Sequence, residues 1–252
     1  MLIAIVLTYN ESAHLAECIE SVRFADRVIV FDSFSTDTTV EIARAHGAEV
    51  IQRQFDDYAG QRNAALAAAR DRGARWVLFV DADERVTSNL QAEILARIAD
   101  RESSVVGYKI PRHNMIFGVL TRGAGWYPDH QMRLLKVGFA QYDPARKVHE
   151  VVLLDGAEGE LHQPFIHYNY QDVKQFHAKQ KRYSAYDARI LFEQGIRAKP
   201  QNYILQPLRH FWWRFVTLKG YQDGVHGFRL SALMAWYELR KYVLLRRLWK
   251  QG

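Results

Sequence analysis

At 252 residues, 48% of them apolar, the chain is long enough to bury one sizeable hydrophobic core. Its single cysteine excludes an internal disulfide framework and suits a reducing compartment. The first residues hold a six-residue apolar stretch without a basic region, so we expect no cleaved signal peptide. No apolar run approaches the ~20 residues that a membrane-spanning helix requires.

The net charge of +6 is unevenly distributed along the chain. Residues 200–252 hold nine Lys or Arg and two Asp or Glu, a balance of +7. The other 199 residues carry 25 basic and 26 acidic groups, a balance of −1. The C-terminal segment also contains four of the six tryptophans. We therefore expect a near-neutral body, residues 1–199, and a basic aromatic tail, residues 200–252.

Apolar runs alternate with helical patterns through the first hundred residues. Thr38 and Glu41 have the spacing of a capping box, Thr87 can cap a later helix, and Gly47 and Gly73 fit helix ends. Strand, helix, strand, helix with short connections predicts an α/β fold, with a mostly parallel sheet covered on both faces. The expected strands are 2–8, 27–32, 49–53 and 75–80, and the expected helices are 12–24, 38–46, 57–72 and 87–98.

The pattern changes after Ser103. Short strand-like runs follow, joined by irregular loops, one of which is the glycine-rich segment 116–129. A helix rich in Lys, Arg and Tyr is expected from about Asp172 to Gln194. The tail then predicts two amphipathic helices, at about 203–219 and 228–250.

Polar residues follow three of the expected strands at the point where each strand ends. They are "TYNE" from Thr8, "DSFSTD" from Asp32 and "DAD" from Asp81. Ligands bind beyond the carboxyl ends of parallel strands, so we expect these residues to line one crevice. The helix that begins after "DSFSTD" would add N–H donors suited to a phosphate or carboxylate.

The carboxylates of Asp81, Asp83 and Glu84 lie within four residues. Clustered anions repel one another unless a positive group lies among them. An Asp-x-Asp pair after a strand can turn both carboxylates toward one cation. Hard oxygen ligands with open positions favour Mg²⁺ or Mn²⁺, with a diphosphate completing the shell. The alternative is a solvated acidic turn.

These segments resemble a known family. "IAIVLTYNE", "VIVFDSFSTDTT", "GQRNAAL" and "WVLFVDADE" are similar to successive motifs of family 2 inverting glycosyltransferases, which have the GT-A fold. "HQMRLLK", "KVHEVV", "FIHYNY", "KQKRYSAYDA" and "GYQDGVHGF" resemble the bacterial branch with lipopolysaccharide core β-glucosyltransferases that act on a heptose.

The resemblance implies inverting transfer from a nucleotide-sugar, a UDP-hexose, to a lipid-linked glycan such as lipopolysaccharide core. It implies a GT-A domain at 1–199, with a nucleotide-sugar half at about 1–100 and an acceptor half at about 101–199. The enzyme would be cytoplasmic and peripheral on the inner face of the cytoplasmic membrane.

The resemblance also implies roles for individual residues. The metal, Mn²⁺ or Mg²⁺, would be held by Asp83, with Asp81 and His167 as further ligands. The nucleotide would contact Asp32, which bonds the uracil or ribose, and the remaining set Thr8, Tyr9, Glu11, Ser33, Arg62, Asn63 and Asp81. For Arg62 the alternative is a solvated helix arginine, and for His167 a structural role.

Inverting transfer needs a base that removes the proton of the acceptor hydroxyl as it attacks the anomeric carbon. Glu150 in "KVHEVV" is the favoured base, and Asp129 in "WYPDHQMR" is the runner-up. The chain departs here from relatives that carry a Glu-Asp pair. The acceptor-binding candidates are Trp126, Tyr127, Arg133 and His149, and core packing is the alternative for the two aromatic residues.

Basic residues around an aromatic face suit an anionic membrane surface. The tail helices could instead pack on the catalytic domain or on the second subunit of a homodimer. We expect no nucleic-acid partner, because no recognised motif accompanies the charge.

Two other functions compete with glycosyl transfer. One is a haloacid-dehalogenase-type phosphatase, which also begins with Asp-x-Asp after a strand. That class requires Thr or Val where Arg85 stands, and it places its aspartates on the first strand. The other is a catalytically silent GT-A binding scaffold, which the intact strand-end motifs disfavour.

Overall fold

The computed structural model describes residues 1–145 and 151–251. The chain forms two compact units, and each unit is built from two segments of the sequence. The first unit comprises residues 1–112 and 130–167, and the second comprises 113–129 and 168–252. The glycine-rich segment and the helix after residue 172 thus group with the tail, a different division from the boundary expected after residue 199.

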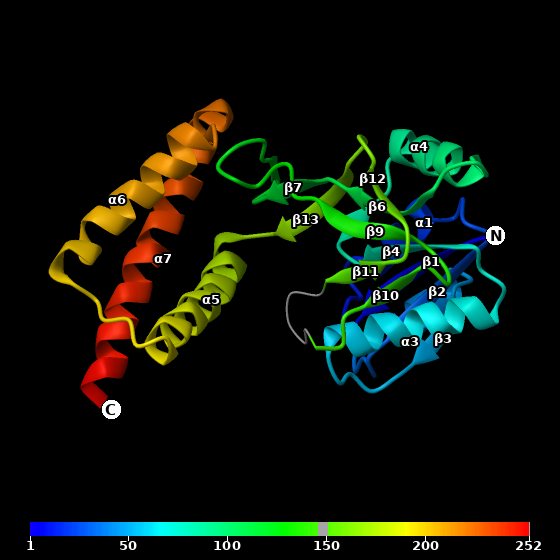
Figure 1. Ribbon diagram of the computed structural model, residues 1–252, viewed down its shortest axis with the longest axis horizontal. Coiled ribbons are helices and arrows are strands. Elements are labelled where there is room, and N and C mark those ends of the chain that lie inside the picture. Colours follow the sequence, from blue (N-terminus) through cyan, green and yellow to red (C-terminus); the bar gives the residue numbers. More distant parts are fainter. Residues whose placement is uncertain (146–150, 252) are drawn as a thin grey trace. The chain divides into compact units, whose positions relative to one another are not determined.

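The first unit is built on a sheet with the strand order β12-β6-β9-β4-β1-β2-β3 (Figure 1). The neighbours β4, β1, β2 and β3 run parallel, and β9 lies antiparallel between β4 and β6. The predicted mostly parallel α/β sheet is therefore confirmed. The strand bounds are β1 Leu2–Thr8, β2 Arg27–Asp32, β3 Glu49–Gln52, β4 Trp76–Asp81, β6 Val105–Ile110, β9 Gln131–Lys136 and β12 Ala157–Glu160.

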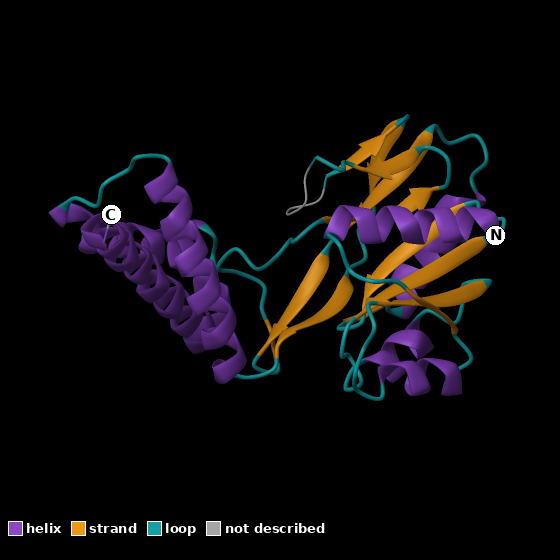
Figure 2. Ribbon diagram, turned by 90° about the horizontal axis from the view of Figure 1, so that it is seen from below, coloured by secondary structure: helices purple, strands orange, loops and turns teal. Residues whose placement is uncertain are grey.

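Helices cover both faces of this sheet because successive strand side chains point to opposite sides. Ala4 and Val6 pack with α1 (Leu15–Ser21), α2 (Thr39–Ala45) and α4 (Ser88–Ala99) in one core. Ile3 and Ile5 pack in the other core with small residues of α3 (Tyr58–Asp71). Figure 2 shows the helices on the two sides of the strands.

Local capping explains where these helices begin. The Thr87 hydroxyl accepts from Leu90 N at 3.2 Å, as predicted, and Asp57 accepts from Gly60 N at 2.7 Å. The expected capping box at Thr38 is wrong, because that side chain makes no capping hydrogen bond. Asp37 accepts from Thr39 N at 3.0 Å instead.

Short strands complete the first unit. β5 (Glu84–Arg85) pairs antiparallel with β13 (Phe165–Tyr170), so that Glu84 lies opposite His167. β10 (Ala140–Tyr142) pairs with β11 (Val152–Leu154). The β5–β13 pairing brings His167, which is far along the chain, next to the turn that follows β4.

The second unit is mainly helical. α7 packs against both α5 and α6, and Figure 2 shows these helices side by side. The core that α5 and α7 share with β7 contains Ile116, Phe176 and Leu230. No described helix is long and apolar enough to cross a membrane. The bounds are β7 Arg112–Ile116, β8 Val119–Leu120, α5 Val173–Glu193, α6 Leu205–Trp212 and α7 Gly224–Gln251.

The tail helices differ from their predicted bounds in two ways. α6 passes at Trp213–Thr217 into a π-helical turn, and α7 begins at Gly224, four residues earlier than expected. Short 3₁₀ turns at Pro200–Tyr203 and Gly220–Asp223 precede the two helices. The chain between them therefore makes a tight corner.

Candidate active site

A cleft of about 750 Å³ opens at the carboxyl ends of β1, β2 and β4. It lies wholly in the first unit, where the strand-end pattern predicted a crevice. The lining includes three arginines and three carboxylates, which balance in formal charge. Eight of the predicted site residues line it: Thr8, Tyr9, Glu11, Ser33, Arg62, Asp81, Asp83 and Arg133.

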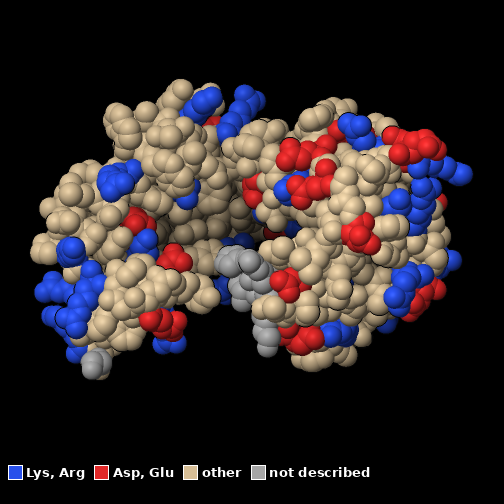
Figure 3. All heavy atoms as spheres, viewed as in Figure 1, with Lys and Arg blue, Asp and Glu red and all other residues tan. Residues whose placement is uncertain are grey.

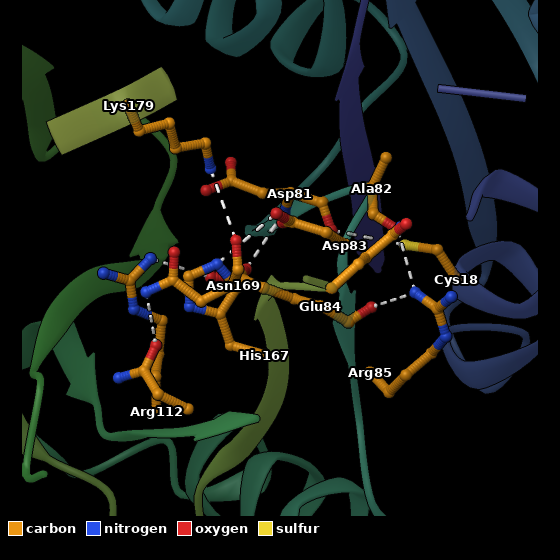
Figure 4. A network of polar contacts seen from close by, with 12 residues as sticks. Cys18, Asp81, Ala82, Asp83, Glu84, Arg85, Arg112, His167, Asn169 and Lys179 are labelled. Carbon is orange, nitrogen blue, oxygen red and sulfur yellow. Dashed lines mark hydrogen bonds and ion pairs between the residues drawn. The ribbon is translucent and has the colours of Figure 1, made fainter. Parts of the chain in front are cut away.

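Arginines from three other elements balance the carboxylates that follow β4. Asp81 accepts from Arg133 Nη1 at 3.0 Å and from Arg62 Nη2 at 3.3 Å, and Arg133 Nη2 contacts its other oxygen. The fully buried Glu84 accepts from Arg133 and Arg112, both at 3.2 Å. Its other oxygen accepts from Asp81 N at 3.0 Å. Figure 4 shows this turn, from which Asp81, Asp83 and Glu84 extend.

The paired charges stabilise one another. Burial acts to raise the pKa of Asp81, but the charges of Arg133, Arg62 and Arg112 outweigh it and hold that pKa well below its usual range. Burial acts to lower the pKa of Arg133, but Asp81 and Glu84 outweigh it and raise the pKa above its ordinary value. These side chains therefore stay ionised at neutral pH.

Asp83 has a different environment from Asp81. It lines the cleft, its side chain is 27% exposed, and its Oδ2 lies 3.4 Å from His167 Nε2. Among residues 1–145 and 151–251, no group of three or more His, Cys, Asp or Glu side chains is placed to hold a metal ion. Among the described residues, the carboxylate of Asp83 and the imidazole of His167 thus fit a divalent cation that takes its other ligands from substrate and water.

Comparison with known proteins decides the family. Residues 3–152 match the model of glycosyl transferase family 2. The chain belongs to this family. The expected glycosyltransferase is therefore confirmed, its α/β architecture is the GT-A fold, and the phosphatase alternative is excluded.

Individual relatives span most of the chain. An uncharacterized glycosyltransferase of Rickettsia bellii is 31% identical over 97% of this chain and 86% of its own length. The lipopolysaccharide core biosynthesis glycosyltransferase LpsC of Rhizobium meliloti is 26% identical over 89% of this chain and 84% of its own. One similar solved structure is glucosyl-3-phosphoglycerate synthase from Mycobacterium tuberculosis, in complex with Mn²⁺, UDP and glucosyl-3-phosphoglycerate. It is 18% identical, the match covers 79% of this chain and 81% of that one, and the TM-score is 0.46.

Asp32 and Asn63, both predicted to contact the nucleotide, make hydrogen bonds within the framework of the glycosyltransferase. Asp32 is fully buried, and its carboxylate accepts from Thr8 Oγ1 at 3.1 Å and from Gln52 Nε2 at 3.0 Å. Asn63 exchanges two hydrogen bonds with the backbone of Tyr142, at 2.9 and 2.8 Å, and so fixes β10 against α3. Asp32 links the ends of β1 and β2 through Thr8. The predicted nucleotide contacts of Asp32 and Asn63 stay predictions.

Of the acceptor-side predictions, Arg133 alone among the described residues lines the cleft. Trp126, Tyr127 and Asp129 belong to the second unit. The favoured base Glu150 and its neighbour His149 lie outside the described residues. Their roles therefore stay predictions.

Sequence reasoning missed two members of the charge network. Glu84 was visible only as part of the acidic run, and nothing in the sequence indicated that it would be buried beneath the arginines. Arg112 is the first residue of β7 and belongs to no recognised motif, and only the fold brings it to the cleft. The edge-on pair of Phe55 and Tyr58, with centroids 5.1 Å apart, also lines the cleft and carried no motif.

Proposed function

We propose that this glycosyltransferase moves a hexose from a UDP-hexose to a lipid-linked glycan, such as lipopolysaccharide core, with inversion at the anomeric carbon. The observation that carries the donor half is the cleft, in which arginines and an exposed carboxylate meet at the strand ends. The similarity to LpsC, a lipopolysaccharide core biosynthesis glycosyltransferase, supports the acceptor half.

The cleft offers complementary surfaces for each part of the donor. Tyr9 is 59% exposed, and with Phe55 and Tyr58 it presents ring surface to a nucleobase. Arg62 and Arg112 line the cleft, and their guanidinium groups can donate hydrogen bonds to a diphosphate. A divalent cation and a nucleoside-diphosphate sugar carry opposite double charges. Together they would enter without disturbing the charge balance of the lining.

Asp83 and His167 are the residues that would hold Mn²⁺ or Mg²⁺. The ion would stabilise charge on the leaving diphosphate. The oxygens of Asp81 are taken by Arg133 and Arg62, so we assign Asp81 to orienting these arginines. Glu150 is the proposed base on the acceptor side, with Asp129 as the runner-up. Either carboxylate would accept the proton of the attacking hydroxyl.

We also propose that the enzyme is cytoplasmic and docks on the inner face of the cytoplasmic membrane through its second unit. α6 and Ile204, the residue before it, expose apolar side chains. Leu208 is 61% exposed and Trp212 is 64% exposed. Residues 194–222 contain five Lys or Arg and no Asp or Glu, a charge that suits anionic lipid. The same charge disfavours a homodimer through this face, because two copies would repel one another.

Ligand binding and turnover test the donor assignment. UDP, UDP-glucose, UDP-galactose and GDP-mannose are compared by thermal shift with and without Mn²⁺, since a bound ligand raises the melting temperature by mass action. We expect a UDP-hexose with Mn²⁺ to give the largest shift. Stabilisation by GDP-mannose alone would overturn the donor class.

Asp83→Asn tests the metal assignment. A neutral amide cannot replace the charge that holds the ion, so Mn²⁺-dependent release of UDP should fall on the order of 10²-fold or more. Asp71→Asn is the matched control, because Asp71 is an exposed carboxylate at the end of α3. Wild-type turnover with unchanged metal dependence in Asp83→Asn would contradict the assignment.

Glu150→Gln and Asp129→Asn test the base and serve as controls for each other. We expect Glu150→Gln to abolish transfer while UDP affinity stays near wild type, because the base acts on the acceptor. Sugar transfer is followed with purified core lipopolysaccharide, and UDP binding by calorimetry. Normal transfer by Glu150→Gln with loss in Asp129→Asn would assign the base to Asp129.

A further inference from the structure

One carboxylate of the C-terminal region holds the backbone of a loop about a hundred residues earlier. Asp223 accepts hydrogen bonds from Arg122 N at 3.0 Å and from Gly123 N at 2.7 Å. Two successive N–H groups that converge on one anion make a charge-assisted contact. The contact lies within the second unit.

The rest of this loop is fixed by the same C-terminal segment. Ala124 N donates to Leu218 O at 2.8 Å, and Ala124 O accepts from Arg214 Nη1 at 2.6 Å. The Thr121 hydroxyl lies 3.1 Å from His226 Nε2. Each of the residues 121–124 is thus bonded to the segment 214–226. We call these contacts the loop clamp.

The loop clamp leaves no space for side-chain atoms where the two segments cross. A Cβ on Gly123 would stand 2.3 Å from the carbonyl oxygen of Lys219. Ala124 and Lys219, one on each segment, both have φ of 55°, in the left-handed region that residues with a Cβ rarely occupy. Such conformations persist where the surroundings over-determine them, and they cluster at functional sites.

The clamped loop leads directly into the predicted acceptor residues. The Arg214 guanidinium lies over the Trp126 ring at 5.6 Å, and Trp126 packs edge-on against Tyr170 with centroids 5.9 Å apart. Tyr127 follows, with its ring 4.3 Å from that of His113. The contacts of the C-terminal region therefore set the direction in which this aromatic pair leaves the loop.

We propose that Asp223 is a positioning residue for acceptor binding, and that the C-terminal helices are part of the acceptor site as well as a membrane contact. This inference rests on the proposed function, because it takes Trp126 and Tyr127 as the rings that stack on the acceptor sugar. The donor cleft lies in the other unit and shares no element of the loop clamp. Loss of the clamp should therefore affect the two substrates unequally.

The test uses the full-length enzyme with a water-soluble acceptor, deacylated lipopolysaccharide core, so that membrane docking does not contribute. We expect Asp223→Ala to lower kcat/KM for the acceptor about tenfold or more, with UDP affinity and hydrolysis of UDP-glucose in the absence of acceptor within about twofold of wild type. Asp223→Asn keeps one acceptor oxygen, so its kcat/KM for the acceptor should lie between the values for the wild type and for Asp223→Ala. Glu193→Gln, which changes an exposed carboxylate at the end of α5, is the matched control.

A second variant, in the loop itself, disrupts the same contact. Gly123→Ala forces the loop away from Lys219 and should reproduce the acceptor-specific loss if Asp223→Ala fails to fold. Hydrogen exchange at Gly123 and Ala124 reports on the clamp directly, and it should speed up in both variants. Equal losses for donor and acceptor, or wild-type acceptor kinetics with an opened loop, would overturn the proposal. A wild-type enzyme that neither binds UDP nor hydrolyses UDP-glucose would instead refute the proposed function.

Discussion

The two units of this glycosyltransferase treat their polar groups in opposite ways. In the first unit, charged side chains that are close in sequence meet partners from three other elements and form an ionic network, with Asp81 and Glu84 at its centre. In the second unit, the carboxylate of Asp223 accepts from two backbone N–H groups of a loop that is distant in the sequence. The first arrangement prepares a charged cleft, whereas the second fixes the path of a loop.

Two buried arginines make the contrast measurable. Arg133 lies between carboxylates, which outweigh its burial and raise its pKa. Arg214 lies between the rings of Trp126 and Trp213, and its burial lowers the pKa to about 10 despite the distant charge of Glu238. A buried cation is thus held by anions in one unit and by ring faces and a carbonyl in the other. On the face shown in Figure 3, acidic and basic groups intermix over the surface of the first unit.

The largest effect on stability is expected from Arg133→Met. Removing this cation leaves Asp81 with Arg62 and the buried Glu84 with Arg112. Because each carboxylate loses one of its cations, the free energy of unfolding should fall by about 3 kcal/mol. Urea denaturation followed by circular dichroism measures the loss.

Arg72→Met is the control for that change. Arg72 pairs with Glu49 on β3, where the carboxylate side chain is 39% exposed, and exposed pairs contribute up to about 1 kcal/mol. Equal losses in the two variants would show that the network at the cleft is no more than a surface ion pair.

The sequence predicted the first unit better than the second for a physical reason. Buried strands and their polar ends are local patterns, so the sheet and the cleft residues from Thr8 to Asp83 followed from short stretches. The burial of Asp32 and the pairing of Asn63 with Tyr142 depend on neighbours brought by the fold, so short stretches of sequence could not indicate these structural contacts.

The second unit depends on contacts between distant segments. Periodicity predicted α5 closely, from about Asp172 to Gln194 against Val173–Glu193, and it predicted that the tail is helical. The rings of Phe211 and Phe215 pack against Phe228, while Trp212 is exposed. Nothing local in the sequence indicated that Asp223 would bind the backbone of residues 122 and 123.

A smaller effect is expected at the membrane face of the second unit. Sedimentation with vesicles should show binding that needs anionic lipid and falls, without vanishing, as salt rises, because basic residues near such a surface contribute about 1 kcal/mol each and are screened. Leu208→Ser and Trp212→Ser should each weaken binding roughly tenfold, since burial of a large apolar side chain contributes about 1.5–3 kcal/mol. Point variants are preferred to truncation near Lys199, because Leu230 and Tyr237 of the tail are buried in the core of this unit.

Phe139→Ser is the matched control, because Phe139 is 40% exposed in the first unit. It should bind vesicles as the wild type does. Sedimentation equilibrium separates lipid docking from a homodimer, since a dimer through α6 would dissociate in Trp212→Ser and would gain nothing from anionic lipid. Vesicle binding by the α6 variants equal to that of the wild type would remove this face as the anchor. The loop clamp would then be the remaining function of the C-terminal helices, because it operates on a soluble acceptor as well as on one held in a bilayer.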